Sequence, residues 1–254
     1  MNPMDNFTSG MGGLLFVAVF FALLVIFTLR NRGQSRRSLR EIPAFDRLRR
    51  GIGLAVEAGQ RLHISIGHGG VFGSGGSASF IGLMLLQRVA RAASISDHPP
   101  VATSGESVAS LLGQDTLRTA YRAVSAEGQF NPLASELSGV TPFSYAAGAL
   151  PVIYDQQVSV NILTGSFGSE AALLADAAER TGSLTLGGSD NPTGQAVLYA
   201  SIQETLVGEE LYAAGAYVQA GASHPASLQV QDILRWVLIG LAVGGALLKM
   251  VGGL

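Results

Sequence analysis

The chain has 254 residues, of which 48% are hydrophobic and only 13% are charged, and its formal net charge is −2. Soluble domains carry about 25% charged residues on average, so this composition indicates membrane segments. Cysteine is absent from the sequence, which excludes disulfides, iron–sulfur clusters and zinc sites built on thiolates.

The first predicted element is a membrane-spanning helix over residues 11–29, "MGGLLFVAVFFALLVIFTL", a run of 19 uncharged residues. A helix needs about 20 apolar residues to cross the hydrocarbon core of a bilayer. Residues 1–10 contain Asp5 and no basic residue, and no small-x-small cleavage site follows. We therefore expect a retained span rather than a cleaved signal peptide.

A basic linker follows over residues 30–50, where eight arginines stand against Glu41 and Asp46, a net charge of +6. Basic loops stay on the cytoplasmic side of a membrane, so residues 1–10 are expected outside and the middle of the chain inside. The arginines are also expected to contact anionic lipid headgroups. They are Arg30, Arg32, Arg36, Arg37, Arg40, Arg47, Arg49 and Arg50.

Residues 51–230 form the predicted cytoplasmic domain, in which short apolar strands alternate with alanine- and leucine-rich helices. This alternation predicts βαβ units and a mostly parallel sheet, that is, a Rossmann-like α/β domain. The expected strands are 61–67, 99–105, 157–165, 183–188 and 202–208, each followed by a helix. Residues 126–155 are less regular and are interpreted as an insertion or a pair of short strands.

The predicted domain is acidic, with fourteen acidic residues against six arginines, a net charge of −8. Nucleic-acid binding requires a basic patch, so we expect no nucleic-acid partner. Neither apolar terminal segment contains a histidine, which argues against an imidazole-ligated haem within the membrane. These observations together predict that the protein works without a cofactor.

A glycine-rich loop follows the first strand within "HISIGHGGVFGSGGSASF" (63–80). Residues 73–78 fit the dinucleotide pattern G-x-G-x-x-A, but the strand ends near Gly67, six residues too early for that motif. A P-loop is excluded because Gly76 occupies the position of its phosphate-binding lysine. The sequence has no G-x-S-x-G elbow of a serine hydrolase, although His68 could act as a base for a loop serine.

Acidic residues recur at the predicted strand-to-helix turns, as Ser-Gly-Glu at 104–106, Gly-Ser-Glu at 168–170 and Gly-Glu-Glu at 208–210. A carboxylate in the first turn caps a helix and interacts with its dipole, which is the simplest interpretation. The same turns lie at the carboxyl ends of parallel strands, where α/β sheets bind ligands. The candidate ligand-binding residues are Gly67, His68, Gly73, Ser74, Gly75, Glu106, Glu170, Asp190, Glu209 and Glu210. We predict no metal site and assign no catalytic residue.

A second membrane span is predicted over residues 233–254, and it returns the C-terminus to the outside. Its uncharged centre, 236–248, has only 13 residues, which leaves an interfacial helix as the alternative. Arg235 and Lys249 flank this centre and can extend toward the headgroups, and Trp236 suits the membrane interface. The two spans would thus form a hairpin with the cytoplasmic domain between them.

Both predicted spans carry small residues four positions apart, a spacing that lets helices approach closely in a membrane. The helix-association candidates are Ala18 and Ala22 in the first span and Gly240 and Gly244 in the second. Alanine and glycine are common throughout this chain, which is the alternative explanation of the spacing.

Four segments of the chain resemble an uncharacterised family of bacterial membrane proteins built around a domain of unknown function. They are "HISIGHGG", "VNILTGSFGSEAALLADAAER", "VGEELYAAGAYVQAG" and "QDILRW". The resemblance covers nearly all of residues 41–240. It implies a membrane-bound α/β domain in a bacterial inner membrane, and the family brings no assigned activity or catalytic residues.

Two functions remain open on this sequence. The favoured hypothesis is a non-enzymatic, membrane-anchored module that self-associates into a homo-oligomer through its small-residue helix faces. The alternative is a domain that binds a small ligand or nucleotide, with or without enzymatic activity, through its strand-end loops. A transporter is less favoured, because neither predicted span has an ionisable residue at its centre.

Overall fold

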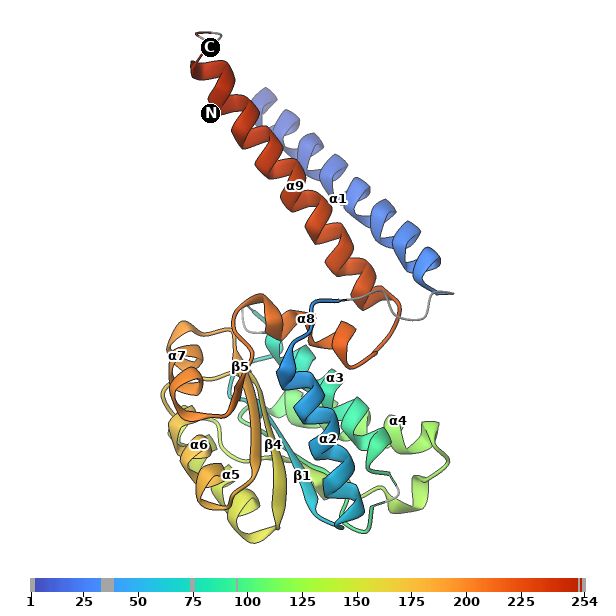
Figure 1. The fold of residues 1–254 in the computed structure, drawn as a ribbon, viewed down its shortest axis with the longest axis vertical. Coiled ribbons are helices and arrows are strands. Elements are labelled where there is room, and N and C mark those ends of the chain that lie inside the picture. The colour runs from blue at the N-terminus through green and yellow to red at the C-terminus, as the bar shows by residue number, and fades with distance from the viewer. Residues whose placement is uncertain (1–2, 33–38, 74–75, 95, 251, 253–254) are drawn as a thin grey trace. The chain divides into compact units, whose positions relative to one another are not determined.

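The computed structural model describes residues 3–32, 39–73, 76–94, 96–250 and 252. The chain divides into two compact units, whose elements are shown in Figure 1. One is the α/β unit, Arg40–Val218, and the other, called here the terminal unit, combines Met1–Leu39 with Gln219–Leu254. The two ends of the chain therefore belong to one unit and its middle to the other.

Six parallel strands form the sheet of the α/β unit, in the order β3-β2-β1-β4-β5-β6. They are β1 (Arg61–Gly67), β2 (Val101–Ser104), β3 (Ser135–Leu137), β4 (Val158–Ser166), β5 (Leu184–Ser189) and β6 (Glu204–Thr205). β1 and β4 are the central pair, with Ile64 opposite Ile162. Along the chain, β2 and β3 are added on one side of β1, and β4, β5 and β6 then follow on its other side. The direction in which strands are added therefore reverses between β1 and β4.

Helices cover both faces of this sheet (Figure 1). α2, α3 and α4 lie on one face and α5, α6 and α7 on the other, and α8 packs against α3. The helices are α2 (Pro43–Glu57), α3 (Gly76–Ala92), α4 (Ser107–Ala123), α5 (Pro142–Asp155), α6 (Ala171–Arg180), α7 (Pro192–Ser201) and α8 (Glu209–Tyr217). The 3-10 turns η1 (Glu127–Gln129) and η2 (Pro132–Ala134) precede β3. The predicted α/β class with a parallel sheet is confirmed.

Apolar side chains fill the space on both sides of the sheet. On the side of α2, α3 and α4, Ile64 packs in a cluster with Leu86 and Leu117. On the side of α5, α6 and α7, Leu163 packs in a second cluster with Tyr145. Burying a leucine or isoleucine side chain contributes about 1.5–3 kcal/mol, so these two layers supply much of the stability of the unit.

The structure contains two helices that the sequence patterns did not predict. α5 lies within the irregular stretch 126–155, and it contains an interior proline, Pro151, a residue that ordinarily interrupts a helix. The helix nevertheless forms because Thr141 and Ser144 make a capping box at its start, and Val152 and Ile153 are buried beside the proline. α2 lies partly in the expected linker 30–50. It was not predicted because its arginine-rich sequence obscures the apolar face that becomes buried.

The terminal unit consists of two long helices, α1 (Pro3–Asn31) and α9 (Ser223–Met250), that pack against each other. Both are long and apolar enough to cross a membrane. On α1 the half-buried residues Phe20, Leu23, Leu24 and Phe27 recur at helical spacing, which marks the face toward α9. The remaining apolar side chains described on α1 are largely exposed, as expected for a lipid-facing surface.

Candidate functional site

The candidate site lies at the carboxyl edge of the sheet, where the strand order reverses between β1 and β4. The chain leaves β1 for α3 on one face and leaves β4 for α6 on the opposite face. The loops after these two strands therefore diverge, and parallel α/β sheets bind ligands at such a switch point.

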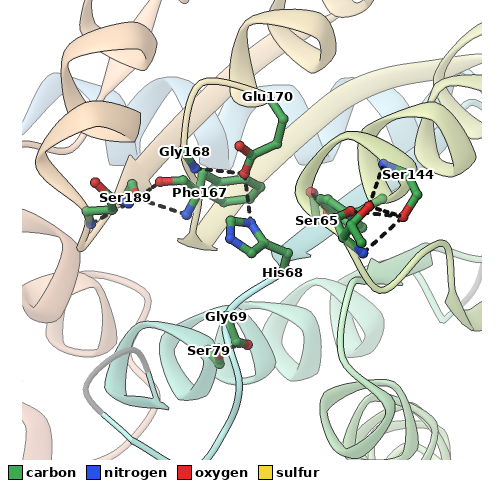
Figure 2. Close-up of polar contacts among 12 residues, drawn as sticks. Ser65, His68, Gly69, Ser79, Ser144, Phe167, Gly168, Glu170 and Ser189 are labelled. Carbon is green, nitrogen blue, oxygen red and sulfur yellow. Dashed lines mark hydrogen bonds and ion pairs between the residues drawn. The ribbon is translucent and has the colours of Figure 1, made fainter.

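His68 and Glu170 meet at this point (Figure 2). His68 directly follows β1, and its backbone N–H donates to Ser166 O of β4 at 3.1 Å. Glu170 lies at the start of α6, where its Oε1 accepts a hydrogen bond from Gly168 N at 2.7 Å. The same oxygen lies 2.7 Å from His68 Nδ1. Two residues that are distant in sequence thus form one polar pair.

The two members of this pair differ in their exposure to solvent. The Glu170 side chain is only 2% exposed, whereas the His68 side chain is 24% exposed. A buried carboxylate is costly unless it has partners, and here the partners are one backbone N–H and the imidazole. The contact between Glu170 Oε1 and His68 Nδ1 is short but does not have the geometry of a hydrogen bond. Nε2 is left as the ring nitrogen that Glu170 does not engage.

Close backbone approaches fix the position of His68. Gly67 has φ +81°, and a Cβ at this position would lie 2.4 Å from Ser166 O. On the other side, a Cβ at Gly105 would lie 2.6 Å from His68 Cα, and Gly105 N donates to Gly67 O at 2.8 Å. The loop after β1 is therefore held between the loops after β2 and β4, and only glycine fits at these contacts.

The loop after β5 is joined to the loop after β4 by Ser189. Its Oγ accepts from Phe167 N at 3.0 Å and from Asn191 N at 3.1 Å, and it donates to Phe167 O at 3.1 Å (Figure 2). Asp190 follows Ser189, and its Oδ1 is buried without a hydrogen-bond partner. Asn191 caps α7, because its Oδ1 accepts from Thr193 N at 3.0 Å. Asp190 is thus free of the capping role and offers an unpaired acceptor.

Two of the other acidic candidates, Glu106 and Glu210, have partners other than His68. Glu106 caps α4, because its Oε2 accepts from Ala109 N at 2.7 Å, as the simplest interpretation predicted. Glu210 contacts the guanidinium of Arg40, and Glu209 is the first residue of α8. The described residues contain no group of three or more histidine, aspartate or glutamate side chains suited to hold a metal ion.

The glycine-rich loop is only partly visible in the described residues. Gly73 has φ +117°, and a Cβ there would meet no atom within 4 Å. Ser74 and Gly75 lie outside the described residues. α3 begins at Gly76, nine residues after the end of β1 at Gly67. This separation agrees with the predicted mismatch to the dinucleotide motif, in which the helix follows the strand through a tight turn.

Three of the four helix-association candidates are exposed in the terminal unit. Ala18, Ala22 and Gly240 are exposed, and Gly244 is half-buried. A Cβ added at Gly240 or Gly244 would meet no atom within 4 Å. The glycine pair is therefore not what brings α9 against α1.

A buried polar network beneath the site was not predicted. His63 Nδ1 lies 2.7 Å from Asn161 Oδ1 and its Nε2 lies 2.8 Å from Thr103 Oγ1. Thr103 Oγ1 is 3.3 Å from the phenol oxygen of Tyr145, which also contacts Ser65 Oγ. The network thus joins β1, β2, β4 and α5 inside the core.

Burial shifts the ionisation of both titratable members of this network. It lowers the pKa of His63 from 6.5 to about 4, against a smaller opposing effect of the Asn161 hydrogen bond. It also raises the pKa of Tyr145, although hydrogen bonds from Ser65, Thr103 and the Gly67 backbone act in the opposite direction. At neutral pH the imidazole is therefore uncharged and the phenol keeps its proton.

The comparisons with known proteins assign no chemistry to this geometry. Neither a curated protein nor a solved structure matches the chain. A family model does match, and it covers residues 4–254, nearly the whole chain. It describes a domain of unknown function, DUF6754, and the chain belongs to that family.

Proposed function

We propose that this chain is a membrane-anchored α/β protein whose α/β unit binds a small polar ligand at the carboxyl edge of its sheet. The observation that carries the proposal is the pair formed by the buried Glu170 carboxylate and the half-buried His68 at the strand-order reversal. A buried carboxylate is uncommon in proteins unless it is paired, and here the paired carboxylate lies at the edge where parallel α/β sheets bind ligands.

The chemistry of the edge favours a ligand that donates hydrogen bonds or carries positive charge. Asp190 Oδ1 is buried and unpaired, and a buried acceptor gains from a donor partner. His68 Nε2 adds a group that can accept or donate according to its protonation. The strand order is that of Rossmann-like nucleotide-binding sheets, which supports ligand binding at the switch point. The long loop between Gly67 and Gly76 argues against the usual dinucleotide pose.

The proposed anchor is the pair of helices α1 and α9, crossing the inner membrane of a bacterial cell. The +6 charge of residues 30–50 supports a cytoplasmic α/β unit, with both termini on the outer side. Two of these arginines, Arg40 and Arg47, contact Glu210 and Glu204 of the α/β unit. Contact of the others with anionic headgroups would add to the anchoring.

Thermal-shift screening of the full chain in detergent tests the ligand proposal. The compounds screened are nucleotides, flavins, polyols and amines, and we expect at least one of these classes to raise the melting temperature. Glu170→Gln keeps an acceptor for Gly168 N but removes the charge, and should weaken binding by about tenfold or more. Glu57→Gln, at an exposed position in α2, is the matched control. The proposal would be contradicted if no class of compound raises the melting temperature, or if the increase is the same in the wild-type chain and in Glu170→Gln.

Self-association through the helix faces is a second candidate function. It is favoured by the open space at Gly240 and Gly244 and by the exposure of Ala18 and Ala22. Gly240→Ile should dissociate an oligomer measured by mass photometry in detergent, whereas Leu238→Phe, on the opposite side of α9, should not. A monomeric wild-type protein would refute this candidate.

A further inference from the structure

Tyr145 is a buried residue at the carboxyl edge of the sheet. It lies in the first turn of α5, which follows β3 and therefore starts at this edge. Its side chain is completely buried. Because a phenylalanine would fill the same space without burying a hydroxyl, the value of the tyrosine lies in the contacts of its hydroxyl.

The hydroxyl of Tyr145 is bound to the end of β1. It contacts Ser65 Oγ and lies 3.3 Å from Thr103 Oγ1 of the neighbouring strand β2. The backbone of Gly67 also forms a hydrogen bond with it. Gly67 is the last residue of β1 and is followed directly by His68. The hydroxyl thus holds two residues of the strand that leads into the His68 loop.

The ring of Tyr145 packs against the other loop of the site. Its centroid lies 6.4 Å from that of the Phe167 ring, and the ring planes are tilted by 44°. Phe167 is the first residue after β4, and the next residue, Gly168, donates its N–H to Glu170 Oε1 at 2.7 Å (Figure 2). Tyr145 therefore contacts both the segment that leads to His68 and the segment that leads to Glu170.

We propose that Tyr145 is a positioning residue of the candidate site, whose hydroxyl and ring together set the distance between His68 and Glu170. The inference rests on the function proposed above, because the pair that Tyr145 positions is the proposed ligand site. Glu170 Oε1 lies 2.7 Å from His68 Nδ1, and a displacement of about 1 Å is enough to impair a site of this kind. Tyr145 acts through the two loops and not on the ligand.

The position of the proton on the His68 ring reports whether this distance is kept. A neutral imidazole carries one proton, on either Nδ1 or Nε2. A bare Nδ1 would place a lone pair beside the Glu170 oxygen 2.7 Å away, so the form with the proton on Nδ1 should predominate. If the two loops move apart, Nδ1 loses this neighbour and the population of the Nε2–H form should increase.

Nitrogen-15 NMR of the imidazole rings in the full chain, in detergent at about pH 8, tests the proposal. The signals of His68 are identified by their loss in His68→Gln, and Glu170→Ala gives the ratio of the two forms without the carboxylate. In Tyr145→Phe, which keeps the ring contact with Phe167, the ratio of the Nδ1–H form to the Nε2–H form should fall by about fivefold, the effect of one neutral hydrogen bond. Because no ligand is added, the positioning role is tested separately from the ligand proposal.

The matched control is Thr103→Val. It removes another buried hydroxyl of the same network, one that contacts His63 Nε2 and Tyr145, but it leaves the contact between Tyr145 and Ser65. Its melting temperature should fall as in Tyr145→Phe, whereas its His68 ratio should equal that of the wild-type chain. An unchanged ratio in Tyr145→Phe would overturn the proposal, and so would an equal fall in both variants, which would show a general loosening of the core. A wild-type ratio equal to that of Glu170→Ala would also overturn it.

Discussion

Replacing Tyr145 by phenylalanine should destabilise the α/β unit by about 2–3 kcal/mol. The ring stays buried in its apolar cluster, so the substitution removes only the hydroxyl that contacts Ser65 Oγ and Thr103 Oγ1. Each neutral hydrogen bond contributes about 1 kcal/mol net, and a buried hydroxyl left without a partner costs about 1–3 kcal/mol. For a unit of this size, each kcal/mol lowers the melting temperature by about 2–4 °C. We therefore expect a decrease of about 5–10 °C.

Thermal melting followed by circular dichroism at one scan rate measures this effect on the full chain in detergent. Tyr154→Phe is the matched control, because Tyr154 lies in the same helix and its side chain is exposed. The control should change the melting temperature by less than about 2 °C. If Tyr145→Phe melts no lower than the control, the buried network does not stabilise the fold and the reasoning is refuted.

Two further predictions concern stability. The pKa of His63 in the folded state, about 4, lies below its ordinary value of 6.5, so unfolding takes up a proton between these pH values. Stability should therefore fall by up to about 3 kcal/mol as pH drops from 6.5 to 4, and His63→Gln should flatten this dependence in melts at several pH values. Gly82→Ala should destabilise the fold by about 1–3 kcal/mol, because its Cβ would lie 2.6 Å from Thr164 O. Gly53→Ala in α2 should instead stabilise the fold by up to about 1 kcal/mol, because a Cβ there would meet open space. Melting temperatures that move in the same direction for both variants would contradict this account of the packing.

The sequence predicted the sheet well because its strands are marked locally. "RLHISIG" alternates polar and apolar residues, and it forms β1 over the predicted residues. An alternating strand ordinarily has one face exposed to solvent, whereas the structure buries both faces of β1. His63 and Ser65 are fully buried because α5 covers their side of the sheet. α5 was not predicted, so the network around Tyr145 could not be predicted either.

The candidate site was predicted as a set of residues but not as a geometry. His68 and Glu170 were both candidates because they follow strands, yet their contact requires β1 and β4 to be neighbours. Local patterns do not encode which strands pair when a long stretch of chain separates them. Glu106 is the converse case. A carboxylate in the first turn of a helix predicts a cap, and Glu106 Oε2 indeed accepts a local hydrogen bond from Ala109 N.

Native mass spectrometry of the full chain, extracted gently from membranes, tests the central claim most directly. The account predicts a small-molecule adduct on the wild-type chain that persists in Glu57→Gln and is lost in both Glu170→Gln and His68→Gln. Circular dichroism of each variant establishes that the α/β unit is folded. A wild-type spectrum without any adduct, or an adduct retained at equal occupancy in Glu170→Gln, would contradict a ligand site at the carboxyl edge.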